Sequence, residues 1–148
     1  SRGRRSTGVY YYDILTRHAF GNLRDILHEI SYNGMMAHYL SFHGSSSRAH
    51  SLTLPDENYA RELMQLFTIG LVELHPDGTE ELTASGETIE TYDTFDIKEF
   101  SKCWTAFEER PQRGNIERGG HVKGNKLDPM QLKANGFATK RDLFPKSK

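Results

Sequence analysis

Apolar residues in the first third of the chain recur at helical spacing. Positions 9 to 20 are rich in aliphatic and aromatic side chains around Ile14 and Leu15, and a second apolar series follows Gly21-Asn22. The members of that series, which fall on one face of a helix, are Leu23, Ile26, Leu27 and Ile30. Asn33-Gly34 then interrupts the pattern before a third, short apolar series. The pattern predicts three helices, near residues 9 to 20, 22 to 33 and 34 to 42.

Residues 43 to 54 are predicted to form a loop. Two longer apolar stripes then predict further helices, one near residues 55 to 69 and one near residues 94 to 108. Pro55 is tolerated in a first helical turn, and Gly70 suits a left-handed residue at the end of that helix. The predicted core face of this helix consists of Tyr59, Leu63, Leu66 and Phe67. Asp93 or Thr94 can cap the following helix. Its predicted core stripe consists of Ile97, Phe100, Trp104 and Phe107.

Residues 71 to 92 lack this helical spacing. They consist of short β-like runs separated by the turn signals Asp77-Gly78 and Ser85-Gly86, a pattern typical of small hairpins. Beyond Glu109 the chain is rich in Gly, Arg, Lys and Asn, which predicts a long irregular region. The predicted fold class is therefore mainly α, a helical domain fragment with a small β-hairpin insertion and an irregular C-terminal region. The predicted divisions are a basic tail (1–8), the helical domain (9–109) with its hairpin insert (71–92), and an irregular extension (110–148).

Charge and composition exclude several classes of partner and site. The 148 residues carry 19 Lys and Arg against 20 Asp and Glu, so the chain lacks the excess of basic charge expected of a nucleic-acid-binding protein. The single cysteine, Cys103, excludes an internal disulfide and a multi-cysteine zinc site, and we interpret it as a buried, inert thiol. No apolar run approaches the ~20 residues that a membrane span needs. We expect no cofactor, because no glycine-rich phosphate-binding motif is present.

The histidines show no spacing typical of metal ligands. Asp25 and His28 lie one helical turn apart, but the chain contains no Glu-x-x-His and no His-Glu-x-x-His motif. We therefore predict no metal site and interpret His28 as a surface or helix-packing residue. Five further histidines are scattered through loops and weak helices and are interpreted as solvated: His38, His43, His50, His75 and His121. The acidic residues of the hairpin insert lack the order of a calcium-binding loop and are interpreted as a solvated face.

The candidate chemistry lies at the start of the helix predicted near 55 to 69. Glu57 and Arg61 are four residues apart, and so are Asn58 and Glu62, which predicts an ion pair and an amide–carboxylate pair. Charges directed into protein need partners, and residues 17–25 offer suitable ones. Two interpretations stay open, a buried network that locks two helices together and a functional site with acid/base or ligand-binding chemistry. The candidate catalytic residues are Glu57, Arg61 and Glu62, and the candidate binding residues are His18, Arg24, Asp25 and Asn58.

Three motifs resemble those of one protein family, in the family's order. Residues 57–70, ENYARELMQLFTIG, resemble the ENFARELMELFTLG signature of the domain-of-unknown-function family 1800, and residues 17–25, RHAFGNLRD, are similar to its HALGNFRDLL stretch. Residues 101–107, SKCWTAF, resemble the family's ARALTGW wording, or ARAWTGF in its eukaryotic branch. The chain departs from these motifs at Gln65 and at Lys102, where the family has glutamate and arginine.

The resemblance implies an internal piece of a larger helical protein of the eukaryotic-type branch, in a family whose members are often exported. The partner it implies is the remainder of the same polypeptide. Our first functional hypothesis is a structural or interaction domain of an exported or surface-associated protein. The alternative is an enzyme, in the hydrolase class, with Glu62 as acid/base and Arg61 or Arg24 orienting an anionic group of the substrate.

Overall fold

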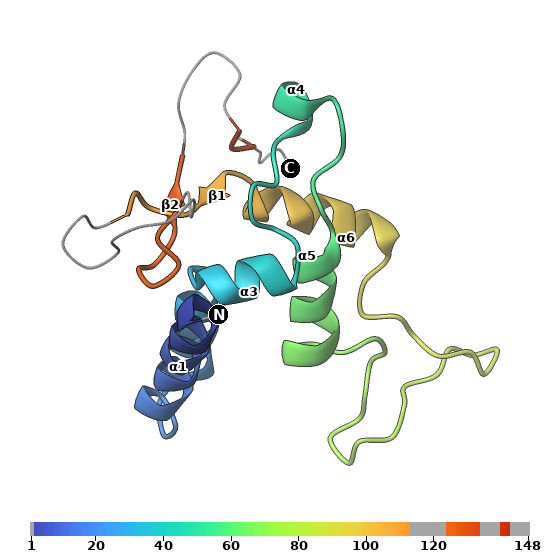
Figure 1. Cartoon of the computed structure of the whole chain (residues 1–148). Coiled ribbons are helices and arrows are strands. Elements are labelled where there is room, and N and C mark those ends of the chain that lie inside the picture. Colours follow the sequence, from blue (N-terminus) through green and yellow to red (C-terminus); the bar gives the residue numbers. More distant parts are fainter. Residues whose placement is uncertain (1, 113–123, 134–139, 143–148) are drawn as a thin grey trace.

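Helices make up most of the computed structural model, which describes residues 2–112, 124–133 and 140–142 (Figure 1). Within these ranges there are six α-helices and one two-stranded antiparallel sheet, so the predicted mainly α fold class is confirmed. The helices are α1 (Arg2–Arg17), α2 (Leu23–Ser31), α3 (Gly34–Tyr39), α4 (Arg48–Ser51), α5 (Asn58–Glu62) and α6 (Thr94–Ser101). The strands β1 (Phe107–Glu108) and β2 (Gln131–Leu132) pair with Phe107 opposite Leu132. None of the helices in the described ranges combines the length and the apolar character needed to cross a bilayer.

The first three helices form where the apolar spacing predicts them, but their ends differ. Helix α1 begins at Arg2, so the segment expected to be a basic tail is helical, and it ends at Arg17 instead of near position 20. The sequence breaks prove to be helix caps. The side chain of Asn22 accepts from the backbone N–H of Arg24 at 2.8 Å and starts α2, and Asn33 caps α3 in the same way. Helix α4 lies inside the segment expected to be a loop.

The helix predicted near 55 to 69 is a composite. Asp56 accepts from the backbone N–H of Asn58 at 2.9 Å, α5 follows, and at Leu63 the chain passes into a π-helical turn, η1 (Leu63–Phe67). Gly70 follows this turn with φ 77°, the left-handed conformation that was expected. The predicted core face is partly wrong, because Leu66 and Phe67 are exposed.

The helix predicted near 94 to 108 also ends early. A capping box formed by Asp93 and Asp96 starts α6, which ends at Ser101 and continues as a 3-10 turn, η2 (Lys102–Trp104). Ala106 then takes a left-handed φ of 65°, which ends helical geometry and leads into β1. Cys103 is exposed, so its interpretation as a buried thiol is wrong.

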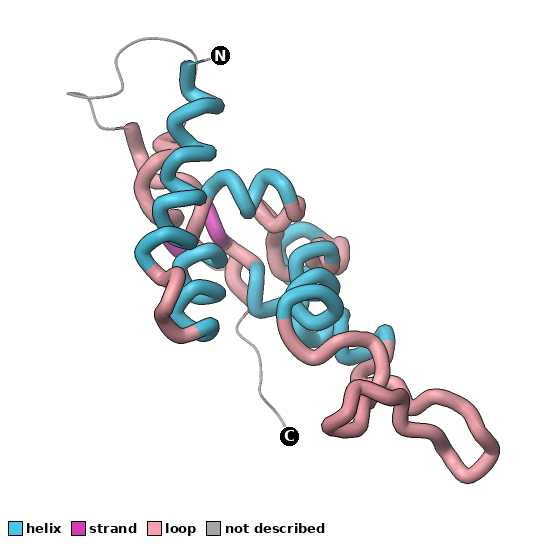
Figure 2. Tube along the Cα trace, turned by 90° about the horizontal axis from the view of Figure 1, so that it is seen from below, coloured by secondary structure: helices cyan, strands magenta, loops and turns pink. Residues whose placement is uncertain are grey.

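The hairpin insert forms a small closed arrangement of three segments. Antiparallel bridges join Val72 to Glu90, Leu74 to Glu80 and Leu82 to Thr88. At its centre three residues form a closed ring of backbone hydrogen bonds, in which the N–H of each donates to the carbonyl of another. Glu73 donates to Ile89 at 2.8 Å, Ile89 to Glu81 at 3.2 Å and Glu81 to Glu73 at 2.9 Å. Both views show the insert projecting away from the helices (Figures 1 and 2).

Aromatic residues form the centre of the core. The ring of Tyr59 stacks on Phe42 with centroids 4.4 Å apart, and Trp104 meets Tyr59 edge-on at 4.7 Å. Phe107 of β1 packs edge-on against Phe42 at 5.7 Å. Because these rings come from α5, η2, β1 and the turn after α3, the core joins segments that are far apart in the sequence. At the edge of the same core, the backbone N–H of Met130 donates to the carbonyl of Tyr32 at 2.8 Å and ties the C-terminal segment to the end of α2.

Candidate functional site

The polar set on α5 pairs mainly within its own helix. A guanidinium nitrogen of Arg61 donates to Glu57 at 3.2 Å, which confirms the predicted ion pair. The Arg61 side chain is 44% exposed and that of Glu57 27%, so the pair is not sealed in the core. Asn58 and Glu62 are half-buried, and among the described residues neither of their side chains makes a hydrogen bond or ion pair.

Residues 17–25 pair with α2 and not with α5. The carboxylate of Glu29 accepts from Arg17 at 2.6 Å and lies 2.8 Å from Nε2 of His18. The hydrogen bond from Arg17, followed by the contact with His18, lowers the pKa of Glu29 below its ordinary value. Arg24 and Asp25 are exposed. The expectation that this segment supplies partners to the α5 set is therefore wrong, and its polar contacts join α1 to α2.

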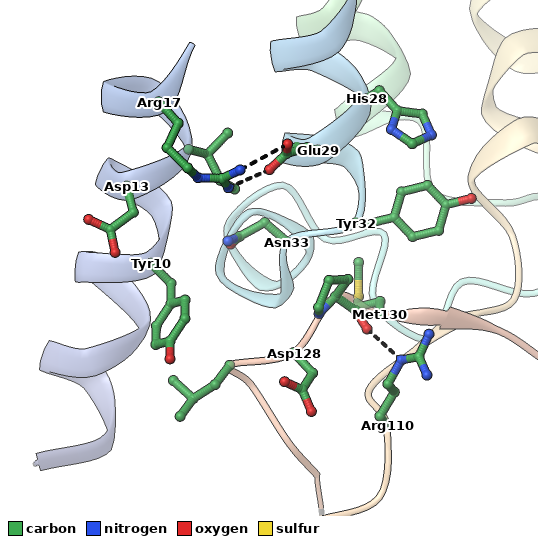
Figure 3. A pocket seen from close by; sticks show the side chains of 13 residues that line it. Tyr10, Asp13, Arg17, His28, Glu29, Tyr32, Asn33, Arg110, Asp128 and Met130 are labelled. Carbon is green, nitrogen blue, oxygen red and sulfur yellow. Dashed lines mark hydrogen bonds and ion pairs between the residues drawn. The ribbon is translucent and has the colours of Figure 1, made fainter. Parts of the chain in front are cut away.

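A cavity of about 560 Å³ lies between α1, the end of α2 and residues 127–130 (Figure 3). Figure 3 shows the Arg17–Glu29 pair at one end, whereas Arg110 lies at the other, where it donates to the carbonyl of Pro129 at 3.0 Å. Tyr10 and Asp128 lie between these two ends. The seven candidate residues from the sequence do not line this cavity. Sequence reasoning missed it because one wall comes from a segment that was predicted to be irregular.

A second group of polar side chains lies near the C-terminal end of α3. Ligand-type atoms of His38, His43 and Glu109 lie within 4.8 Å of one another. Nε2 of His38 is 2.8 Å from Glu109, and the two imidazole rings stack with centroids 4.2 Å apart. Burial, with the neighbouring His38 as the next cause, lowers the pKa of His43. The interpretation of these two histidines as scattered is therefore wrong, although His38 is exposed as expected, whereas His43 is half-buried. His121 lies outside the described residues.

The comparisons with known proteins assign a family without an activity. The model of a family of proteins of unknown function, DUF1800, matches residues 2–137. No curated protein and no solved structure matches the chain. The family description names no reaction, ligand or partner.

Proposed function

The chain belongs to the DUF1800 family, and we propose that it is an interaction domain that holds a basic, apolar protein segment on η1 and the hairpin insert. The observation that carries this proposal is the composition of residues 66 to 93, which we call the acidic apolar segment. It contains seven of the chain's 20 acidic residues and none of its 19 Lys and Arg. Exposed large apolar side chains are concentrated in the same stretch: Leu66, Phe67, Ile69, Leu71, Leu74 and Leu82.

Large exposed apolar patches on a folded domain mark sites of association, because covering them removes apolar surface from water, and the concentration of six such side chains in one segment favours a site there. Leu63 is 8% exposed and belongs to the core, whereas Leu66, three residues further along η1, is 66% exposed. The apolar surface is thus a continuation of the core along the same turn. A partner that covers it must also neutralise the acidic side chains around it, which favours Lys and Arg.

The family resemblance supports one source for this partner, the remainder of the same polypeptide. The same resemblance is what supports an exported or surface-associated location.

The test uses two synthetic amphipathic helices with the same leucine face, one with lysine and one with glutamate on the flanks. Fluorescence anisotropy with the 148-residue chain should show the lysine peptide binding at least about tenfold more tightly. A Leu74→Ser/Leu82→Ser variant should lose about tenfold in affinity, whereas Leu52→Ser, which changes an 86% exposed leucine outside the segment, should not. Equal binding of the two peptides, or binding that is indifferent to the double substitution, would overturn the proposal.

The enzyme alternative has one observation in its favour. The carboxylate of Glu62 is half-buried without a partner among the described residues, and it directly precedes the π-helical turn η1. Such turns are frequent at functional sites. In this hydrolase hypothesis Glu62 acts as acid/base and Arg61 orients an anionic group of the substrate. Its test is the stability of Glu62→Gln, developed below.

A further inference from the structure

Three side chains with metal-ligand chemistry converge from three separate elements. His38 lies on α3, His43 in the turn that follows α3, and Glu109 directly after β1. In the described part of the chain, no other group of at least three His, Cys, Asp or Glu side chains comes as close. The histidines are 66 and 71 residues from the carboxylate in sequence, so the fold, and not local spacing, assembles this group.

The two histidines are held by the backbone around them. Ser41 takes a left-handed φ of 65°, which reverses the chain after α3. The backbone N–H of His43 then donates to Ala37 at 3.0 Å, and that of Gly44 donates to Phe107 of β1 at 3.1 Å. His43 therefore follows the fully buried Phe42 at a fixed place between α3 and β1.

The carboxylate of Glu109 is held in an equally defined place. Its side chain is only 11% exposed, and it lies directly against Gly124. A Cβ on Gly124 would be 1.7 Å from a carboxylate oxygen of Glu109, so only glycine leaves room for this side chain. The adjacent bridge between Arg110 and Asn125 fixes the two segments in register.

We propose that His38, His43 and Glu109 bind one divalent transition-metal ion of the zinc class, with water in the remaining coordination positions. Two imidazole nitrogens and one carboxylate oxygen suit zinc, cobalt and nickel, whereas calcium and magnesium prefer oxygen ligands throughout. His38 is 42% exposed, which leaves the site open to water on that side. This ion site is independent of the peptide-binding surface proposed above.

The distances require a small contraction on binding. Atoms that share a tetrahedral zinc ion at about 2.0 to 2.1 Å lie roughly 3.3 Å apart, and the three ligand atoms lie within 4.8 Å of one another, so the widest separation has to close by at most about 1.5 Å. Rotation of the exposed His38 side chain can supply this movement. Lys126 opposes it, because its ammonium group lies 3.9 Å from the Glu109 carboxylate and competes for the same oxygen.

The direct test is titration of the chelator-treated 148-residue chain with Co²⁺, followed by visible absorption, and with Zn²⁺, followed by calorimetry. One ion per chain should bind, and the cobalt form should show the absorption of nitrogen- and oxygen-coordinated Co²⁺. His38→Ala, His43→Ala and Glu109→Gln should each weaken binding by at least about tenfold. Lys126→Met should tighten it, because the competing charge is removed.

The matched control is His75→Ala. His75 also lies beside a glutamate, with Nδ1 3.4 Å from Glu81, but among the described residues it belongs to no group of three such side chains. This variant should bind Co²⁺ and Zn²⁺ as the unchanged chain does. Circular dichroism of each variant before titration shows whether it is folded, and Lys126→Met tests the site without removing a ligand. Binding that survives in His38→Ala/His43→Ala, or no binding of either ion to the unchanged chain, would overturn the proposal.

Discussion

The buried hydroxyl of Tyr59 joins α5 to α2, and its hydrogen-bond direction gives an asymmetric prediction. The hydroxyl of Ser31 donates its only hydrogen to the carbonyl of Leu27 at 2.7 Å. In the 2.8 Å contact between the two side chains, Tyr59 must therefore be the donor and Ser31 the acceptor. Burial raises the pKa of Tyr59, which keeps it in this neutral, donating form.

The two single substitutions should consequently differ in cost. Tyr59→Phe removes one hydrogen bond and leaves Ser31 with its bond to Leu27, so it should lower the free energy of unfolding by about 1 kcal/mol. Ser31→Ala leaves the Tyr59 hydroxyl buried without an acceptor, which should cost about 2 to 3 kcal/mol. The double variant contains neither group and should cost only about 1 kcal/mol, less than the sum of the singles.

Urea unfolding followed by the fluorescence of Trp104, the single tryptophan, measures these differences. Its ring lies edge-on against Tyr59, so its emission reports on this part of the core. In a thermal scan, 1 kcal/mol corresponds to about 2 to 4 °C for a chain of this size. Additive costs, or a Tyr59→Phe variant less stable than Ser31→Ala, would refute the assigned hydrogen-bond direction and the coupling between the helices.

Three further predictions concern charged side chains. Glu62→Gln should change the free energy of unfolding by less than about 0.5 kcal/mol in urea unfolding, because the half-buried carboxylate has no partner in the described residues. A loss of about 3 kcal/mol would show a buried charge pair and contradict the enzyme alternative. Gly124→Ala should lower the thermal midpoint by the equivalent of about 1 to 3 kcal/mol, because the added Cβ collides with Glu109; an unchanged midpoint would contradict the packing. The hydrogen bond from Lys133 is the largest cause that holds the pKa of Glu108 below its ordinary value near 4.5. The folded state therefore gains stability above that pH and loses it as the pH falls through the lowered pKa. Urea unfolding should show that Lys133→Met loses less stability between pH 6 and pH 3 than the unchanged chain does. Equal losses would count against the pair.

Local signals in the sequence predict the elements that local contacts stabilise. Asp93 or Thr94 was expected to cap a helix, and Asp93 does so with its own side chain, because a cap needs only residues two and three positions ahead. Gly70 was expected to adopt a left-handed conformation and has φ 77°. The ion pair between Glu57 and Arg61 forms at its i, i+4 spacing for the same reason.

Features set by distant segments could not be predicted in this way. Helix α6 ends at Ser101 although its apolar stripe continues to Phe107, because a turn at Ala106 directs Phe107 into pairing with β2. The contact between His38 and Glu109 spans 71 residues, so no motif spacing announces it. Leu66 has the spacing of a core residue but is exposed, since η1 alters the helical register after Leu63.

The C-terminal segment, which shows the weakest sequence pattern, organises both the cavity and the proposed ion site. Consecutive residues of an extended chain point in opposite directions, and after β1 Glu109 meets the two histidines whereas Arg110 lines the cavity. In the opposing segment Lys126 lies beside Glu109, whereas Leu127 and Asp128, which follow it, line the cavity. A substitution that displaces this segment should therefore affect the cavity and the ion site together, whereas a change at the Glu57–Arg61 pair of α5 should leave both intact. The cavity and the proposed ion site thus lie together where α1 to α3 face residues 107–110 and 124–132, whereas the proposed peptide-binding surface lies on η1 and the hairpin insert.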